Sequence, residues 1–280
     1  MNRTFKIRYI ICLTASIVLS AVVFSLFFVF GQSGMLGKVI TPKQKAMPDQ
    51  VSAVITQKDE KELLRESIKK YEAYLASPYL ISVTKETALP EDYSVDITTI
   101  PDFPEISLET NAAQKLNEFL SEAKAKNIAF TVFAGYRSAE EQQQIYNKKR
   151  ESVKAAGFTD EKIIEQKTQL STDLPGHSEH QTGLAVDIGQ TTSDVSSEVV
   201  LTEFYKYAKE NIYKYGFIIS YPENSYTGYE FMPWHFRYIG DPEQAKYINE
   251  KNISLQSYIE YLQAQIQANR TRLEELENAK

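Results

Sequence analysis

Cysteine and histidine are scarce in this sequence of 280 residues, and basic residues are outnumbered by acidic ones. The single cysteine, Cys12, excludes an intrachain disulfide. The 31 Lys and Arg against 37 Asp and Glu give a net charge of −6, so the composition gives no indication of nucleic-acid binding, which usually shows a basic patch. Only three histidines, His177, His180 and His235, are available for any chemistry that needs an imidazole.

One stretch near the N-terminus lacks charge altogether. It runs over residues 9–30 (YIICLTASIVLSAVVFSLFFVF), and a helix needs about 20 apolar residues to cross a bilayer. Arg3, Lys6 and Arg8 precede the stretch, whereas Lys38 is the first basic residue after it. This bias predicts a cytoplasmic tail over 1–8, a transmembrane helix over 9–30 and the rest of the chain outside the cell membrane.

A cleaved signal peptide is the alternative for residues 9–30. Its apolar region is typically about 7–15 residues long and ends at a small-residue cleavage site. The stretch here is longer and ends in FFVFGQSG, which is a poor site of this kind. We therefore expect an uncleaved, single-pass signal anchor.

The segment after the anchor, residues 31–75, reads as a stalk followed by an amphipathic helix. Residues 31–56 are rich in Gly, Ser, Pro, Lys and Gln, and residues 58–75 place apolar side chains at helical spacing. Residues 77–105 resemble loops with short strands. The tail, 254–280, is predicted as one helix with Asn269 at an otherwise apolar seam. It either packs on its own domain, which we prefer, or forms a homodimer with a second copy.

Residues 76–253 show an alternation of helices and strands that indicates an α+β domain. A helix is predicted after Leu108 and a buried strand over 128–135. Ser138 and Glu141 form a capping box for the next helix. Residues 198–214 indicate another helix that ends near Gly216, and FIISYP and FMPWHFRYI indicate two more strands.

The strongest local motif is SEHQTGLAVDIG, residues 178–189. It presents His180 and Asp187, and an imidazole with a carboxylate suits a divalent metal. A catalytic zinc usually takes three protein ligands, and His235 in PWHFRY is the only histidine distant from this segment, since His177 directly precedes it. On residue types alone, histidines hydrogen-bonded inside a core remain the commoner explanation, and for His177 we keep that interpretation.

The order of these motifs resembles a known family. S-x-H-x-x-G-x-A-x-D followed by P-W-H-x-R-Y is similar to the VanY-type D-alanyl-D-alanine carboxypeptidases, which also include L,D-carboxypeptidases of peptidoglycan stem peptides. GYRS at 135–138, Gln143, Tyr146 and KYGFIISYP match other parts of the family. The resemblance covers residues 108–254 and implies a compact zinc-peptidase domain, over 76–253, with a small antiparallel sheet flanked by helices.

The resemblance also implies roles for individual residues. His180, Asp187 and His235 would bind Zn²⁺, and Arg137 would hold a substrate carboxylate or a developing oxyanion. Ser178, either a substrate contact or a turn cap, is a further candidate, as are Gln143 and Trp234. The substrate would be a peptidoglycan stem peptide that loses its C-terminal D-alanine, and both D,D and L,D cleavage fit the motifs.

The sequence departs from the family at the general base. The family usually has a glutamate three residues before the last histidine, but this chain has Met232, whose thioether cannot accept a proton. Glu230 lies two residues earlier, about 6.5–7 Å away along a strand and on the same face. Glu230 takes over as base if a bulge or the bend at Pro233 shifts the register. Otherwise the domain is a weakened enzyme that binds or regulates the cell wall and keeps its metal site.

Overall fold

The computed structural model describes residues 49–191, 196–223 and 228–279. The predicted tail over 1–8, the predicted anchor over 9–30 and the stalk as far as residue 48 lie outside these ranges. Within the described ranges, no helix has the combined length and apolar character that a membrane span requires.

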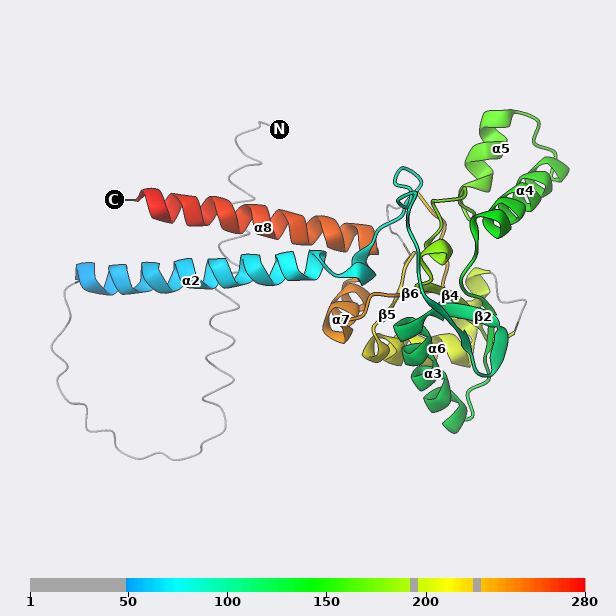
Figure 1. Cartoon of the computed structure of the whole chain (residues 1–280), viewed down its shortest axis with the longest axis horizontal. Helices are drawn as coiled ribbons and strands as arrows, with labels where there is room; N and C mark the ends of the chain where they lie inside the picture. Colours follow the sequence, from blue (N-terminus) through cyan, green and yellow to red (C-terminus); the bar gives the residue numbers. More distant parts are fainter. Residues whose placement is uncertain (1–48, 192–195, 224–227, 280) are drawn as a thin grey trace. The chain divides into compact units, whose positions relative to one another are not determined.

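A four-stranded antiparallel sheet forms the centre of the domain (Figure 1). Its strands lie in the order β3 (Thr131–Ala134), β4 (Ala185–Gly189), β6 (His235–Tyr238) and β5 (Phe217–Ile219). The predicted α+β class with a small antiparallel sheet is therefore confirmed. The strands are shorter than the sequence patterns predicted, because the FMPW part of the last run is irregular and β6 begins only at the histidine.

One face of this sheet packs into the hydrophobic core, and the other carries the polar side chains of the site. Side chains alternate along a strand, so Val186 and Ile188 of β4 point to one face with Phe236 of β6. That face forms the main hydrophobic core with helices α3 (Thr110–Ala125) and α6 (Glu203–Asn211). The opposite face carries Asp187, which pairs with His235 in the register of β4 and β6. The pattern that buries the core thus also places two ligand side chains together on the other face.

A β-hairpin precedes α3 and leads the chain into the sheet. It consists of β1 (Ile97–Ile100) and β2 (Phe103–Glu109). Glu109 ends the hairpin and caps α3, because its carboxylate accepts a hydrogen bond from the Ala112 N–H. The hairpin lies against the strand β3, where the carbonyl oxygen of Ser107 accepts a hydrogen bond from the Tyr136 N–H.

The helix predicted over 198–214 is broken into three pieces, so that prediction was only partly right. They are η3 (Ser197–Leu201), α6 and η4 (Ile212–Tyr215). Thr202 has extended backbone angles and caps α6 with its hydroxyl group, which starts a new helix instead of continuing the old one. Gly216 follows η4 with φ 79°, the left-handed conformation expected at a C-cap.

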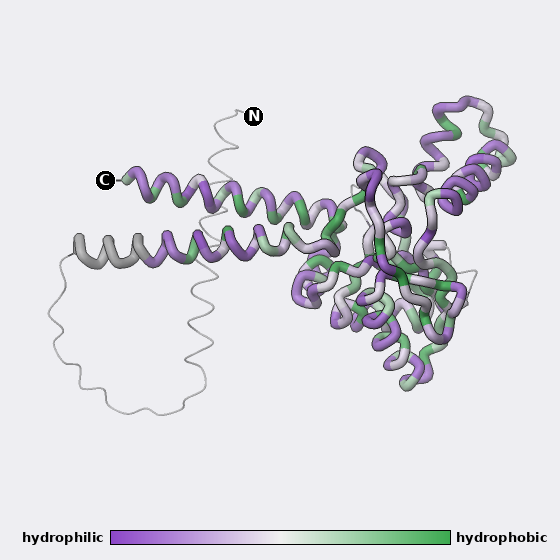
Figure 2. The backbone as a smooth tube through the Cα atoms, viewed as in Figure 1, coloured by the Kyte–Doolittle hydropathy of each residue, from purple (hydrophilic) through white to green (hydrophobic). Residues whose placement is uncertain are grey.

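Helices α4 (Ala139–Ala155) and α5 (Glu161–Thr168) follow β3 in the chain and pack against each other. The predicted capping box is present, with the Ser138 hydroxyl and the Glu141 carboxylate each accepting a backbone N–H of the other residue. In Figure 2 α4 is mainly hydrophilic, since it buries only a few side chains. A loop over 169–178 then leads to η2 (Glu179–Thr182) and β4.

The C-terminal helix packs against the helix that precedes the domain. Helices α2 (Asp49–Leu75) and α8 (Leu255–Asn278) run side by side and antiparallel, joined by the pairs Arg270–Glu72 and Arg65–Glu277 (Figure 1). Asn269, the polar residue of the predicted seam, donates to the Ser67 hydroxyl. The predicted homodimer finds no support here, because the seam of α8 is partnered within the chain.

The base of this helical pair is tied to the domain. Helix α7 (Pro242–Lys251) and the short η1 (Pro78–Leu80) complete the junction. A second apolar cluster includes Leu80, Ile218, Ile248 and Leu262, with tyrosines of α2 and α8 packed against it. The two helices therefore share a core with strand β5.

Candidate metal centre and its cavity

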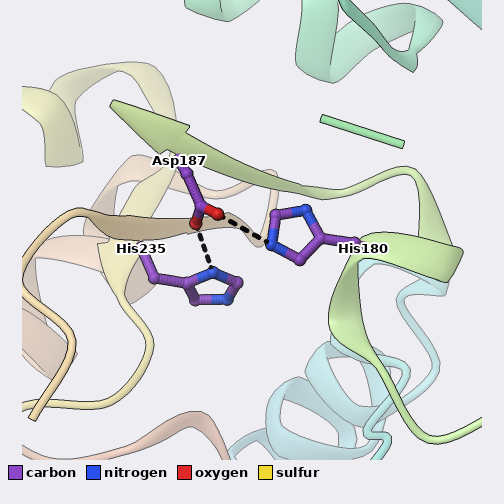
Figure 3. Close-up of side chains that lie close together, drawn as sticks. All are labelled: His180, Asp187 and His235. Atoms are coloured by element: carbon purple, nitrogen blue, oxygen red, sulfur yellow. Dashed lines mark hydrogen bonds and ion pairs between the residues drawn. The ribbon is translucent and has the colours of Figure 1, made fainter. Parts of the chain in front are cut away.

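Three ligand side chains come together on the polar face of the sheet. His180, Asp187 and His235 are buried and point toward one another (Figure 3), and one ligand atom from each lies within 4.8 Å of the others. Asp187 Oδ2 is 3.3 Å from His180 Nε2, and Asp187 Oδ1 is 2.8 Å from His235 Nδ1. The structure therefore unites the three residues that the sequence pattern singled out from two distant motifs.

His180 is held as a neutral imidazole. Its Nδ1 lies 2.7 Å from the Gly135 carbonyl oxygen, which can only accept, so Nδ1 carries the proton and Nε2 keeps a lone pair. Burial is the main reason why the pKa of His180 falls to about 4, and the positive charge of Arg137 adds to it. Such an imidazole is ready to bind a metal through Nε2.

His235 has a carboxylate on each side of its ring. Nδ1 faces Asp187, and Nε2 lies 2.9 Å from Glu179 Oε2. Burial lowers the pKa of His235, but the hydrogen bonds to Asp187 and Glu179 outweigh it and raise the pKa to about 9. A metal at Nδ1 would replace one proton, while Glu179 would keep the ring oriented through Nε2.

Glu179 is in turn balanced by a buried cation. Arg237, which is fully buried, places Nη1 3.5 Å from Glu179 Oε1. Arg237 also donates to the carbonyl oxygens of Tyr79 and Ile81. Burial by itself would raise the pKa of Glu179, but His235 and Arg237 outweigh it and lower the pKa, so this carboxylate stays ionised.

The donor set fits a zinc ion. Ligands at about 2.0–2.1 Å from a tetrahedral zinc lie about 3.3 Å from one another. The His180–Asp187 separation of 3.3 Å equals this value, and the 2.8 Å between Asp187 and His235 is close to it. Two imidazoles and a carboxylate leave a fourth position, as in catalytic zinc sites.

The three ligands open onto a cavity of about 300 Å³. Its walls come from α4, the loop over 169–178, the motif segment and the chain before β6. A second cavity, of about 440 Å³, shares Glu179 and Tyr221 with it but none of the three ligands, so the smaller one is the candidate active site. Its polar and charged lining residues besides the ligands include Arg137, Gln142, Asp173, Ser178, Glu179 and Glu230.

Most of the predicted substrate contacts lie in this cavity. Arg137, between β3 and α4, places Nη2 3.3 Å from Asp187 Oδ2. Ser178 is buried and lines the cavity, and its side chain makes no cap hydrogen bond, so the capping alternative is wrong. Trp234 lines the cavity and packs against the core.

Gln143 is placed elsewhere. It is exposed, and its amide donates to Asn147 on the outer side of α4. Its neighbour Gln142 is buried and lines the cavity, since one residue step turns a helix by about 100°. Gln142 Nε2 donates to the Asp173 carbonyl oxygen at 2.7 Å, whereas Gln142 Oε1 is buried with no hydrogen-bond partner within the described part of the chain.

The position of the expected base is apolar. Met232 is buried in the cavity wall, and Glu230 lines the same cavity but is exposed to solvent. Residues 229–232 are not in a strand, so the alternation argument that placed both on one face does not apply. Glu230 as base stays a prediction.

Two tyrosines join the cavity to the sheet. Tyr221 stacks on the His235 ring with centroids 5.1 Å apart, and Tyr229 packs on Tyr221 at 4.4 Å. Tyr221 lines the metal cavity, whereas Tyr229 lines the larger neighbouring cavity. His177 makes a hydrogen bond between Nδ1 and the Thr84 carbonyl oxygen and stays outside the metal centre, as expected.

Comparison with known proteins agrees with this geometry. The model of the VanY family, described as D-alanyl-D-alanine carboxypeptidase, matches residues 105–241. The putative carboxypeptidase YodJ of Bacillus subtilis is 35% identical over 194 residues, which are 65% of this chain and 67% of that protein. This chain belongs to the VanY family.

Solved structures of VanY proteins share the fold. VanYB in complex with D-alanine-D-alanine has a TM-score of 0.58 at 31% identity, over 65% of this chain and 97% of that one. A glutamate-to-alanine mutant of VanY in complex with Zn(II) has a TM-score of 0.57 at 31% identity, over 65% and 99% of the two chains. The VanY resemblance read from the motifs is therefore confirmed.

Four residues of the metal centre and its cavity were not predicted from the sequence. Glu179 lies in the motif of residues 178–189, next to His180. A carboxylate beside a metal ligand in the sequence could have indicated a residue that orients a ligand imidazole. Arg237 lies two residues after His235 and so shares its face of β6, which alternation predicts. No sequence pattern indicated Gln142 or Asp173, because the packing of α4 and the path of the loop over 169–178 bring them to the cavity.

Proposed function

We propose that this protein is a zinc-dependent carboxypeptidase that removes the C-terminal D-alanine from peptidoglycan stem peptides. The observation that carries this proposal is the buried His180–Asp187–His235 centre with an open cavity in front of it. Related structures hold Zn(II) and D-alanine-D-alanine, which supports both the metal and the substrate class.

The chain's own residues suit the recognition of a peptide end. The Arg137 guanidinium would bind the terminal carboxylate of the substrate, since a planar cation pairs well with a carboxylate. The unpartnered Gln142 Oε1 would accept an N–H group of the substrate, which offsets the cost of its burial. When bound, zinc supplies Lewis-acid chemistry that polarises the scissile carbonyl and makes the attacking water more acidic.

The test uses the full-length protein, purified in a mild detergent. We expect about one zinc per chain by elemental analysis and release of D-alanine from defined stem peptides, read by mass spectrometry. His235→Ala should lose the metal and the activity. Intact protein without metal would refute the zinc assignment, and release of anything other than D-alanine would refute the substrate assignment.

Two sets of peptides separate the D,D and L,D reactions. Pentapeptides ending in D-alanyl-D-alanine report the first, and tetrapeptides ending in a single D-alanine report the second. We expect the pentapeptide to be the better substrate, in line with the dipeptide bound by VanYB. A preference for the tetrapeptide would assign the L,D reaction instead.

A cell-wall-binding domain without activity is the second candidate, and the buried Met232 favours it. The test compares wild type with Met232→Glu. If D-alanine is released only by the variant, the protein is a degenerate enzyme that keeps its metal centre. Activity of the wild type removes this candidate.

The predicted anchor implies on which side of the membrane the reaction would take place. With residues 9–30 in the membrane and the basic residues before them in the cytoplasm, the peptidase domain would face the cell wall. Membrane fractionation with a carbonate wash, together with protease treatment of intact cells, checks this arrangement. Recovery of the protein in the culture medium would indicate a cleaved signal peptide.

A further inference from the structure

Four carboxylates line the metal cavity, and two of them are committed to other partners. Asp187 belongs to the metal centre, and Glu179 is held by His235 and Arg237. The remaining two are Asp173 and Glu230. We propose that Asp173 is the general base of this site. The proposal rests on the proposed peptidase function and names the residue that moves the proton.

Asp173 is held in place with one oxygen left available. Its exposed fraction is 8%, and its Oδ1 accepts a hydrogen bond from the Tyr229 hydroxyl at 2.6 Å. Its carbonyl oxygen accepts from Gln142 Nε2 at 2.7 Å, which fixes the backbone at this point of the loop. Oδ2 has no hydrogen-bond partner among the residues that the structure describes, so it can accept a proton from water in the cavity.

The surroundings of Asp173 give it the basicity of a proton acceptor near neutral pH. Burial raises its pKa most, and the negative charge of Glu179 raises it as well. The hydrogen bond from Tyr229 and the charges of Lys85 and His235 lower it, and together these effects bring the pKa to about 6. A base whose pKa lies near the working pH is ionised and still holds a proton well once it has taken one.

Glu230 lacks these features. It is exposed, and among the residues that the structure describes its only hydrogen bond is from its backbone N–H to the Leu170 carbonyl oxygen. An exposed carboxylate keeps its hydration shell, and nothing in the described chain orients it toward the ligands. Asp173, which is buried and held by Tyr229, is therefore the more firmly positioned of the two carboxylates.

In the proposed reaction Asp173 carries one proton from water to the leaving group. Asp173 Oδ2 takes a proton from a water molecule while the water oxygen forms a bond to the carbonyl carbon of the scissile peptide. The C–N bond then breaks, and Asp173 returns the proton to the departing nitrogen. The new carboxyl group gives up the remaining proton of the water, which the amine takes up, so the products are D-alanine as an ammonium and a stem peptide one residue shorter that ends in a carboxylate.

The experiment compares wild type, Asp173→Asn and Glu230→Gln in the full-length, zinc-loaded protein. Each is assayed for D-alanine release, zinc content and affinity for a stem-peptide analogue that cannot be cleaved. For Asp173→Asn we expect kcat to fall by about 10²–10⁴-fold, the usual share of a general base. Its zinc content should be unchanged, and its affinity for the analogue should stay within about twofold, since Asn keeps the shape and the acceptor for Tyr229.

A double variant guards against a purely structural effect. Met232→Glu places a carboxylate at another point of the same cavity wall, so Asp173→Asn combined with Met232→Glu should recover part of the lost kcat. Recovery shows that the missing group was a proton acceptor and that the fold is intact.

The outcomes separate this proposal from the peptidase function. Active wild type with active Asp173→Asn, or a larger loss in Glu230→Gln, overturns Asp173 as base and leaves the peptidase function standing. A fall in zinc content or analogue affinity equal to the fall in kcat also overturns it, because Asp173 would then be structural. Zinc-loaded wild type that releases no D-alanine refutes both proposals.

Discussion

Replacing Asp173 by asparagine should stabilise the metal-free protein at neutral pH. The pKa of this carboxyl group rises from 3.8 to about 6 on folding, so the folded state favours its protonated form. The resulting stabilisation is complete below pH 3.8 and is lost as the pH rises through 6. At pH 7.5 the ionised carboxylate therefore lowers the free energy of unfolding, and a neutral amide removes that cost.

The size of this effect follows from the same shift. Each pKa unit corresponds to about 1.36 kcal/mol, so the difference between 3.8 and about 6 amounts to about 3 kcal/mol. Asp173 is 8% exposed, so solvent screening reduces this upper value only slightly. In a domain of this size, about 3 kcal/mol raises Tm by about 6–12 °C.

The assay is urea or thermal unfolding of full-length protein with a chelator present, at pH 7.5 and at pH 4.0. We expect a clear gain for Asp173→Asn at pH 7.5 and almost none at pH 4.0. Zinc should reduce the gain, because a cation in the cavity favours the ionised carboxylate. Glu230→Gln, an exposed carboxylate of the same cavity, is the matched control and should change stability little. Equal gains at both pH values, or a loss at pH 7.5, would show that the charge of Asp173 does not destabilise the folded protein.

Substitutions at Tyr229, Glu179 and Gly135 test other contacts of the site. Tyr229→Phe removes the hydrogen bond that lowers the pKa of Asp173, so the acid limb of the kcat/KM profile should move to higher pH; an unmoved limb contradicts this. Glu179→Gln weakens the partner of His235 Nε2, and chelator competition should show zinc binding about 10–100-fold weaker; equal affinity argues against an orienting role. Gly135→Ala should lower stability by about 1–3 kcal/mol in urea unfolding, because the new Cβ would meet a main-chain oxygen of β2 at 2.5 Å; wild-type stability contradicts this clash.

Local chemistry in the sequence determined much of the scaffold. The capping box at Ser138 and the C-cap at Gly216 are confirmed because each depends on a few adjacent residues. The helix predicted from residue 58 is present within α2, and the tail helix begins after Ser254 as the sequence indicates. The helix predicted over 198–214 was only partly right, because the extended backbone at Thr202 interrupts a pattern that is periodic on both sides.

The partner of the tail helix was decided by packing. An apolar seam with one polar residue specifies that a helix needs a partner but not which one. In the folded chain α2 supplies it, with Ser67 accepting the hydrogen bond from Asn269. Sequence periodicity alone favoured packing within the chain only slightly over pairing with a second copy.

The metal ligands, too, were identified from the sequence but brought together only by the tertiary structure. The spacing of His180 and Asp187, together with His235, identified the ligand types from the sequence by family resemblance. Only the register of β4 against β6 brings Asp187 opposite His235, because antiparallel pairing joins residues that are far apart in the chain.

The choice of the proton acceptor depends on tertiary structure still more. Sequence showed that Met232 cannot act as a base and that Glu230 is near it along the chain. It had no means to show that the loop after α5 buries Asp173 in the same cavity, with Tyr229 on one carboxylate oxygen. Proton chemistry depends on burial and on neighbours from other segments, and only the folded chain determines both.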